Sequence, residues 1–319
     1  MSRATALYVG RRLLLTLPTL LIVAILVFTL VRLIPGDPAQ VMLGDAADPE
    51  AIAALREHMG LDRPLWVQFL HWLGQVAQGD LGSSIITSEP VRALVLDRFV
   101  VTASIVVTAV ALATLAAILF GLIAASRRGS PVDSAIVATA TLTMAIPSFW
   151  LGLMLILIFG VKLGWLPVVG YVPLSDGLTA GLPYLVLPVV TLATVESGVL
   201  IRMMRASALD VLRLDYVTHA RAKGLSERSV LLRHVFPNAF APTMTLVGLT
   251  LGHLLGGAAV VETLFTLPGL GRLMVDGVLS RDYPVVQGCL LFTALVYVIV
   301  NLITDLLYPL LDPRVALGE

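Results

Sequence analysis

Six long apolar runs constrain this chain more than any other feature of its 319-residue sequence. A helix that crosses a membrane needs about 20 consecutive, mostly apolar residues. Runs of this kind cover 13–33, 102–125, 134–161, 183–203, 243–261 and 285–311. The composition agrees, because 58% of the residues are hydrophobic and 13% are charged, whereas about 25% of residues are charged in soluble domains. The sequence therefore predicts an all-α, polytopic membrane protein with six transmembrane helices.

The first run is too long for the apolar part of a cleaved signal peptide, which has about 7–15 residues. The sequence before the RLIPGDP segment also lacks a small-x-small cleavage site. We therefore expect the first run to be a retained helix.

Basic residues are distributed unevenly among the loops. One set of alternate segments contains Arg3, Arg11, Arg12, Arg127, Arg128, Arg205, Arg213, Arg221, Lys223, Arg228 and Arg233. By the positive-inside rule these segments, and both termini with them, are cytoplasmic. The longest loop of the other side, 35–101, has nine acidic residues and four arginines, which favours a periplasmic position.

These assignments divide the chain into four parts. Residues 1–34 are the cytoplasmic N-terminus and the first helix, and 35–101 are a periplasmic loop. Residues 102–311 are the core with helices two to six and the loop 205–238, and 312–319 are a cytoplasmic tail.

The long loop is expected to contain two short amphipathic helices. Asp48 can cap a helix that begins with Pro49 and Glu50, and a second apolar stripe follows Pro64. The apolar positions of the two stripes are Ile52, Leu55 and Met59, then Trp66, Phe69, Leu70, Leu73 and Val76. Such helices either pack on the ends of the spans or form a docking surface for an external partner.

Motifs of several enzyme classes are absent from the sequence. It has no H-E-x-x-H zinc motif, no G-x-S-x-G elbow and no G-x-x-x-x-G-K-[ST] phosphate loop. The five histidines do not pair at the spacing of metal ligands. We therefore expect no catalytic activity, metal or cofactor in this chain, and any ATP and Mg²⁺ should be bound by partner subunits.

A secondary transporter or channel is the alternative function. Such proteins place ionisable residues within the membrane to bind substrates or coupling ions. Glu196 in the fourth run and His253 in the fifth are the two candidates.

The most polar stretch between two runs is DYVTHARAKGLSERSVLLRHVFPN, which begins at Asp215. Its ARAK sequence favours a helix, Gly224 stands where a C-terminal cap is expected, and Ser226 can cap a second helix. Pro237 is expected to end that second helix. An elbow of two helices suits a groove on a partner protein, whereas a merely solvated loop would not need the ordered glycine and proline.

This stretch resembles the cytoplasmic coupling motif of ABC importer permeases, which has E-A-A, three residues, glycine and later I-x-L-P. Thr218 to Ala220 stand at the E-A-A positions, with threonine in place of glutamate as in the peptide-type branch, and Gly224 stands at the glycine. The peptide-type pattern DYxxxARAKGL…H…NA…P is matched by Asp215, Tyr216, Ala220, Arg221, Ala222, Lys223, Gly224, Leu225, His234, Asn238, Ala239 and Pro242. The resemblance assigns ATPase coupling to the matched positions up to Asn238. It also assigns this role to Pro237, which stands near the closing proline of the motif.

The resemblance covers nearly the whole chain and points to the dipeptide/oligopeptide/nickel family. The segments PGDP, GLDRP, GDLGSS, IPSFWLG, GWLP, VETLFTLPGLGRL, RDYP and DLLYPLLDPRV follow in order from residue 35 to residue 315. A periplasmic family motif comprises Pro268, Gly269, Gly271, Asp282 and Tyr283. The chain departs from the family at Val100 and Val101, where proline is frequent, and at Glu196, which puts the lining of the path in doubt.

The resemblance implies the type I permease fold and an ATP-driven importer in a bacterial inner membrane. Its partners would be a second permease, two cytoplasmic ABC ATPases and an extracytoplasmic substrate-binding protein, and this chain would be the first permease of the pair. The 205–238 loop would carry the coupling helix. The cargo stays open among peptides, nickel chelates, glutathione and related solutes, because the binding protein selects it.

Small residues and prolines mark further positions within the runs. Gly248, Gly252 and Gly256 allow a close helix contact, either with the partner permease or within the chain. Pro147 and Pro188 are expected to kink the third and fourth spans. The candidates for the translocation path are Glu196, His253, Pro147, Ser148 and Phe149.

Overall fold

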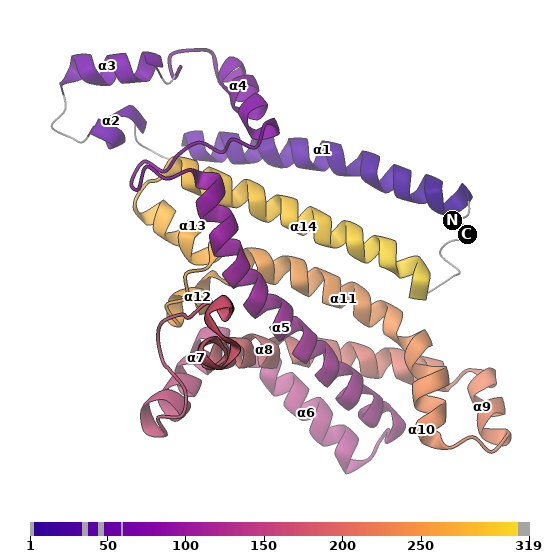
Figure 1. Cartoon of the computed structure of the whole chain (residues 1–319). Helices are drawn as coiled ribbons and strands as arrows, with labels where there is room; N and C mark the ends of the chain where they lie inside the picture. The colour runs from indigo at the N-terminus through magenta and orange to yellow at the C-terminus, as the bar shows by residue number, and fades with distance from the viewer. Residues whose placement is uncertain (1–2, 34–37, 44–47, 59, 312–319) are drawn as a thin grey trace.

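The computed structural model describes residues 3–33, 38–43, 48–58 and 60–311 (Figure 1). Within these ranges the chain is helical, apart from loops and a β-bridge between Ser83 and Pro90. The predicted PGDP motif at 35–38, Met59 and the tail 312–319 lie wholly or largely outside the described residues. The helices are α1 (Arg3–Leu33), α2 (Pro38–Leu43), α3 (Pro49–His58), α4 (Leu65–Ala77), α5 (Val91–Ser126), α6 (Pro131–Ala145), α7 (Ser148–Leu155), α8 (Leu178–Leu212), α9 (Asp215–Ala222), α10 (Glu227–Val230), α11 (Phe236–Gly257), α12 (Ala259–Leu264), α13 (Leu270–Leu279) and α14 (Tyr283–Leu311).

Five segments of the described chain are long and apolar enough to cross a membrane. They lie in α1, α5, α8, the joined helix Glu227–Gly256 and α14, and a bent pair of helices brings the number up to six. The prediction of an all-α, polytopic membrane protein is therefore confirmed.

The third predicted span, 134–161, is not one straight helix. α6 ends at Ala145, and the following pair, α7 with the π-helical turn η1 (Ile156–Lys162), continues at 100° to it. Ile146 is extended, with φ −84° and ψ 121°, because the ring of Pro147 disfavours a helical conformation in the residue before it. The expected kink at Pro147 is thus a complete break, whereas α8 runs through Pro183 and Pro188 without one.

Pro237 does not end the second helix of the polar stretch, so that prediction was wrong. α10 continues through a π-helical turn, η3 (Leu231–Val235), into α11, and Pro237 lies in the first turn of α11. A proline is tolerated there because the wider turn before it does not depend on the N–H that proline lacks. The fifth span therefore reaches back to the polar stretch.

The loop predicted at 35–101 is largely helical. α3 and α4 form where the two amphipathic helices were expected, and α2 was not predicted. α5 begins at Val91, directly after Pro90, so its first turns fall in the segment assigned to the loop. The domain boundary at 101/102 therefore cuts through a helix.

α5 and α8 form the centre of the bundle, with α6 and α11 packed against them. Small residues allow this proximity. A Cβ at Gly121 of α5 would lie 2.7 Å from the side chain of Met204 in α8, and one at Gly198 of α8 would lie 2.5 Å from the carbonyl oxygen of Ala140 in α6. The resulting core holds the fully buried Ile105 and Leu200.

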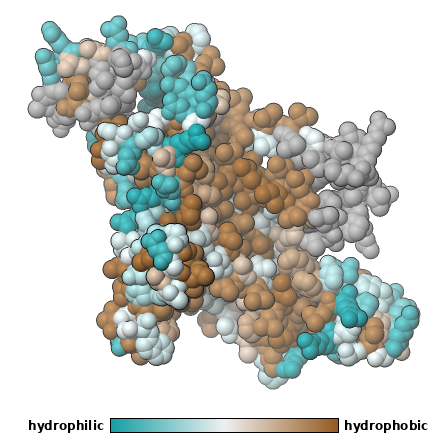
Figure 2. All heavy atoms as spheres, in the orientation of Figure 1, coloured by the Kyte–Doolittle hydropathy of each residue, from teal (hydrophilic) through white to brown (hydrophobic). Residues whose placement is uncertain are grey.

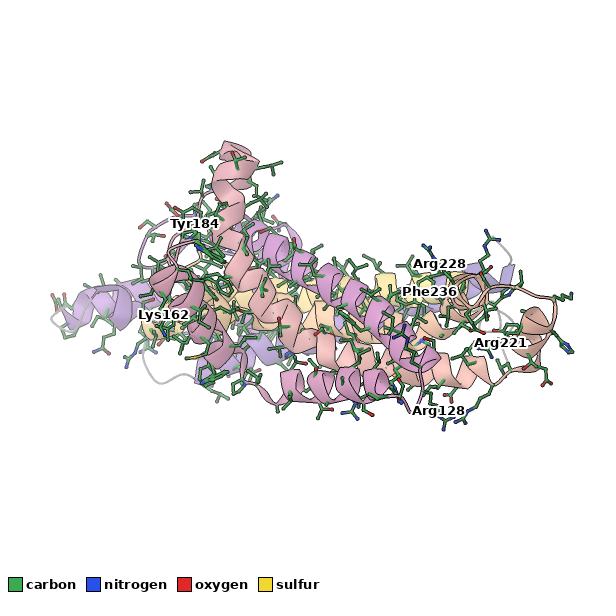
Figure 3. The ribbon with its side chains drawn as sticks, turned by 90° about the horizontal axis from the view of Figure 1, so that it is seen from below. Arg128, Lys162, Tyr184, Arg221, Arg228 and Phe236 are labelled. Atoms are coloured by element: carbon green, nitrogen blue, oxygen red, sulfur yellow. The ribbon has the colours of Figure 1, made fainter. Side chains whose placement is uncertain are left out.

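The surface has an apolar middle between two polar ends. Figure 2 shows brown atoms over the central helices and teal atoms over α3 and α4 at the upper left and over α9 and α10 at the lower right. We name these the α4 end and the α9 end. Arg128, Arg221 and Arg228 lie together at the α9 end, whereas Lys162 and Tyr184 lie at the other (Figure 3).

The three glycines of α11 face α14 of the same chain. A Cβ at Gly252 would lie 2.8 Å from the ring of Tyr297, and one at Gly256 would lie 2.8 Å from Thr293. A Cβ at Gly248 would overlap the side chain of Thr304. Within the single chain these glycines therefore make a close internal contact, and a contact with the partner permease stays a prediction.

We predict that Gly248→Val destabilises the bundle. The new side chain overlaps Thr304, and overpacking of this kind costs about 1–3 kcal/mol. Thermal unfolding of the detergent-solubilised chain measures the loss, and adding Thr304→Ala should restore part of it. Gly10→Val is the matched control, because a Cβ at Gly10 meets no atom within 4 Å. Equal stability of the two valine variants would contradict the proposed packing.

Candidate functional site

α9 and α10 form a short elbow that projects beyond the bundle at the α9 end (Figure 1). The chain leaves α8 at Leu212, and the extended Leu214 precedes the first turn of α9. Asp215 lies in that first turn and Arg221 in the last. Both charges are favourable for the helix dipole.

A glycine cap ends α9 as the sequence predicted. Gly224 has φ +80°, its N–H donates to the carbonyl of Arg221 at 2.9 Å, and the N–H of Leu225 donates to that of Ala220 at 3.4 Å. This pair of bonds is a Schellman motif, which requires the left-handed conformation that glycine adopts without strain.

The second helix of the elbow is capped by Ser226. Its Oγ accepts from the N–H of Ser229 at 3.4 Å. Across the turn, Nε and Nη2 of Arg221 donate to the two carboxylate oxygens of Glu227 at 2.8 and 3.2 Å. Both side chains are exposed, so this pair fixes the angle of the elbow more than it stabilises the fold.

Three motif residues meet at one backbone carbonyl. The hydroxyl of Tyr216 donates to the carbonyl oxygen of His234 at 3.1 Å. The side-chain N–H of Asn238 donates to the same oxygen at 2.8 Å. These bonds join α9 to the π-helical turn, so the two halves of the motif form one unit.

The inner side of the elbow is packed against the bundle. Val217, Val230 and Val235 are fully buried, and Ala220 is 7% exposed. They belong to one apolar cluster with side chains of α5 and α8, which are Ala113, Ala117, Leu122, Ala125, Leu200, Ile201, Met204, Ala208 and Val211. We name this cluster the elbow seat.

The outer side of the elbow is exposed to solvent in the single chain. Most of the predicted coupling residues are exposed, namely Asp215, Tyr216, Arg221, Ala222, Lys223, Gly224, Leu225, Pro237 and Asn238, whereas Ala220 is buried and His234 is half-buried. Leu214, Leu225 and Leu232 are 41–49% exposed among these charges. The result is a mixed apolar and basic surface of the kind that docks into a groove.

Glu196 of α8 and His253 of α11 lie close enough to interact electrostatically. Glu196 is half-buried and His253 is exposed. The two ionisable residues that the sequence singled out within the spans are thus within electrostatic range of each other, and no hydrogen bond or ion pair joins them in the described part of the chain.

The other path candidates lie on the bend between α6 and α7. Pro147 and Phe149 are exposed and Ser148 is half-buried. In the described part of the chain no hydrogen bond or ion pair joins them to Glu196 or His253. Gly198, two residues after Glu196 in α8, nevertheless packs on Thr143 and Met144 of α6. This part of α8 therefore lies next to the end of α6, just before the bend.

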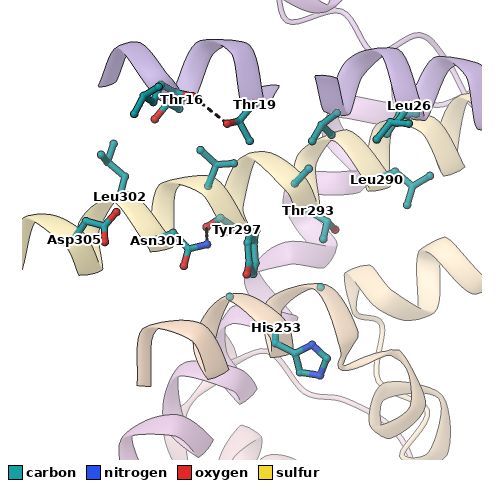
Figure 4. A pocket seen from close by; sticks show the side chains of 17 residues that line it. Thr16, Thr19, Leu26, His253, Leu290, Thr293, Tyr297, Asn301, Leu302 and Asp305 are labelled. Carbon is teal, nitrogen blue, oxygen red and sulfur yellow. Dashed lines mark hydrogen bonds between the residues drawn. The ribbon is translucent and has the colours of Figure 1, made fainter. Parts of the chain in front are cut away.

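A groove of about 790 Å³ lies on the opposite side of α11, between α1, α11 and α14 (Figure 4). Thr16, Thr293, Asn301 and Asp305 line it together with aliphatic side chains. His253 contributes to its edge, but its imidazole points away from α14. Glu196 is not among the residues that line this groove.

Two family models match the chain. "Binding-protein-dependent transport system inner membrane component" matches residues 117–317, and the N-terminal model of the same membrane components matches residues 6–106. The chain belongs to this permease family. It is a membrane permease subunit of ABC importers, as the elbow motif predicted.

Relatives agree with this assignment over almost the full length. The permease is 44% identical over 299 residues to a putative peptide transport system permease protein of Brucella abortus, covering 94% of this chain and 95% of the relative. It is 44% identical over 308 residues to the glutathione transport system permease protein GsiC of Salmonella choleraesuis, covering 97% and 98%.

A solved structure shows the same fold. Inward-facing MetNI, a methionine ABC transporter, matches with a TM-score of 0.53 and 16% identity, covering 71% of this chain and 100% of the matched chain. The type I permease architecture expected from the resemblance is thus observed for most of the chain.

The family motif at the α4 end of the permease forms a buried joint. Glu262 is fully buried. Its carboxylate accepts from Thr102 Oγ1 at 2.6 Å and from the N–H of Arg272 at 2.9 Å. Thr102 Oγ1 in turn accepts from the N–H of Leu270 at 2.8 Å. Burial raises the pKa of Glu262, and these hydrogen bonds oppose the rise. The carboxylate therefore caps the N-terminus of α13 and ties it to α5.

Two glycines of this motif leave room for the joint. A Cβ at Gly269 would overlap the Glu262 carboxylate, and one at Gly271 would lie 2.7 Å from the backbone of Ala259. Pro268 precedes them in the same loop. The family resemblance marked these positions, but the partner of Gly269 is visible only in the structure.

Asp282 forms a second joint at the same end. Its carboxylate accepts from the hydroxyl of Ser84 and from the N–H of Ile85 and Val285. The segment before α5 is thereby held to the start of α14. The neighbouring Tyr283 is 6% exposed.

An ion pair near the α9 end was not predicted from the sequence. Arg205 of α8 donates from Nε and Nη2 to the carboxylate of Asp133 in α6 at 2.6 and 2.7 Å, and Gly129 N–H donates to the same carboxylate at 2.9 Å. The Asp133 side chain is 6% exposed. A local spacing rule does not reveal this pair, because its members are 72 residues apart.

We predict that Asp133→Asn lowers the stability of the permease by about 2 kcal/mol. The amide loses the charge and turns an N–H group toward the guanidinium of Arg205, which stays half-buried without its counter-ion. Chemical or thermal unfolding in detergent measures the loss.

Glu227→Gln is the matched control for this prediction. It breaks a bidentate pair of the same kind that is exposed, and such pairs contribute at most about 1 kcal/mol. Equal losses in the two variants would show that burial of the Asp133 pair adds nothing.

Proposed function

We propose that the permease imports peptides or related small solutes as half of a heterodimeric translocation path. The names of the two relatives, a peptide and a glutathione permease, support this cargo class. Its partners would be a second permease, two cytoplasmic ATPases and an extracytoplasmic binding protein. ATP and Mg²⁺ would bind to the ATPases, since the chain lacks a phosphate-loop motif.

The elbow carries this proposal. Its outer face exposes leucines and basic residues, while its inner face is buried in the elbow seat. An ATPase that grips the outer face would therefore move α5 and α8 through the inner face. Closure of two ATPases would in this way switch the cavity between its inward- and outward-facing forms.

The alternative, a secondary transporter or channel that uses Glu196 and His253, has less support. A secondary transporter needs no binding protein, whereas the family model describes binding-protein-dependent transport. We assign the pair instead to the lining of the path.

The orientation is a further part of the proposal. Arg128, Arg221 and Arg228 gather at the α9 end, and α1 begins and α14 ends there (Figure 1). The positive-inside rule then makes the α9 end cytoplasmic and the α4 end periplasmic, with the permease in the inner membrane.

Cysteine labelling tests this orientation. Asp48→Cys and Glu227→Cys should react with an impermeant thiol reagent from opposite sides of the membrane. The native Cys289 is fully buried, so the unmodified chain supplies the background control. Labelling of both positions from one side would overturn the topology.

We predict that Gly224→Val uncouples the transporter while the spans still insert and pair. A Cβ at Gly224 meets no atom within 4 Å, so the substitution acts through backbone strain of at least about 1 kcal/mol. The altered α9 cap should weaken ATPase binding and abolish the stimulation of hydrolysis by loaded binding protein. A pull-down of the ATPases and hydrolysis in reconstituted membranes measure both effects.

Gly129→Val provides a closely matched control. Gly129 has φ +74°, and a Cβ added there would meet no atom within 4 Å, but this glycine lies between α5 and α6. The variant should keep ATPase binding and stimulation. If Gly224→Val couples as the wild type does, the elbow does not transmit the motion.

Glu196→Gln tests the assignment to the path. A carboxylate beside His253 would attract cationic parts of a cargo, so the variant should reduce transport of cationic peptides more than that of neutral ones. Uptake of matched peptides by proteoliposomes measures the difference. If Glu196 has a structural role instead, Glu196→Gln should take up all peptides as the wild type does, and Glu196→Ala should fail to assemble.

A further inference from the structure

An apolar groove of about 560 Å³ lies between α1, α4, α5 and α14 at the α4 end. Leu21 and Ala24 of α1, Val76 of α4, Leu96 of α5 and Leu295 of α14 are among its lining residues. It is separate from the elbow and from the pair formed by Glu196 and His253. Its walls present few hydrogen-bonding groups to a polar solute, and their apolar side chains suit a hydrocarbon chain.

One charged side chain, Arg92 of α5, reaches this groove. A Cβ at Gly79 would lie 3.4 Å from Nη1 of Arg92, so the guanidinium lies beside the loop that follows α4. Within the described residues Arg92 makes no hydrogen bond or ion pair. The nearby Asp80 carboxylate instead accepts from the N–H of Gly82 at 2.8 Å. The groove therefore combines an apolar interior with a cation that has no partner in the described part of the chain.

α4 sets the level of this cation in the membrane. It presents Leu65, Trp66 and Leu70 outward, each 57–67% exposed, while Phe69 and Trp72 pack on Phe28 of α1. Exposed tryptophan on an amphipathic helix is typical of a position at the boundary between acyl chains and headgroups. We therefore expect Arg92, beside the loop that follows α4, to lie at the height of lipid phosphates.

We propose that this groove binds an anionic phospholipid, with an acyl chain between α1, α5 and α14 and the phosphate on Arg92. A guanidinium attracts the phosphate of such a lipid by charge and can donate hydrogen bonds to its oxygens. One cation beside an otherwise apolar groove matches a phosphate that is followed by an acyl chain. The bound lipid would fill the space between α1, α5 and α14.

Native mass spectrometry of the full-length permease with its partner permease tests the proposal. After exchange into nanodiscs of phosphatidylglycerol and phosphatidylcholine and release into detergent, the wild type should retain phosphatidylglycerol preferentially. Arg92→Gln should reduce that retention about fivefold, since one cation near the membrane surface contributes about 1 kcal/mol. Retention of phosphatidylcholine should not change. Arg63→Gln removes an exposed arginine of the same loop region outside the groove and should retain as much as the wild type.

A second pair of variants tests the groove without changing charge. Leu21 lines the groove and is 46% exposed, so Leu21→Trp should fill it and lower retention of phosphatidylglycerol. Leu17 lies one turn earlier, is 65% exposed and is not a groove residue, so Leu17→Trp should have no effect. Retention that is equal in the wild type, Arg92→Gln and Leu21→Trp would overturn the proposal. Cross-linking of Leu21→Cys to the second permease through a thiol-reactive photo-cross-linker would overturn it too, because a protein would then occupy the groove.

Discussion

The position of the elbow depends on the burial of three valines in the elbow seat. Val217, Val230 and Val235 are fully buried, and burial of each valine is worth about 1.5 kcal/mol or more relative to an exposed one. The exposed Arg221–Glu227 pair contributes at most about 1 kcal/mol. Apolar packing, more than the ion pair, therefore holds the elbow against α5 and α8.

The joints at the other end follow a different physical rule. There the chain turns between short helices near the membrane boundary, and buried carboxylates satisfy backbone N–H groups that the turns leave open. The Glu262 carboxylate accepts a hydrogen bond from a backbone N–H at the start of α13. The Asp282 carboxylate accepts from N–H groups at the start of α14 and in the segment before α5. Asp133 and Arg205 tie α6 to α8 in a comparable way. The bundle between the two ends is thus held by small residues in close contact and by a few fully bonded charges.

The sequence predicted what local chemistry determines. Span positions followed from apolar length, and the caps at Gly224 and Ser226 followed from the residues beside them. Contacts between distant segments were beyond such rules. Two such contacts join different helices: the Asp133–Arg205 ion pair, and the contact of Gly248 with Thr304. Pro147 predicts a break in the helix, but the angle of 100° depends on how α7 packs. The prediction that Pro237 ends a helix was wrong for a related reason, because a π-helical turn before Pro237 lets the helix continue. Most of the fold was therefore predictable, whereas the geometry of the candidate site was predictable only at the elbow.

Pulsed EPR distances test most directly whether the elbow and the bundle move as one body. Spin labels at Arg228 of α10 and Ala206 of α8, both exposed, report the distance across the elbow seat in the reconstituted complex. We expect this distance to be the same without nucleotide and with ATP, while the separation between the elbows of the two permeases changes. A change with ATP in the distance from Arg228 to Ala206 would contradict coupling through the elbow seat, because the elbow would then move without the helices that line the path.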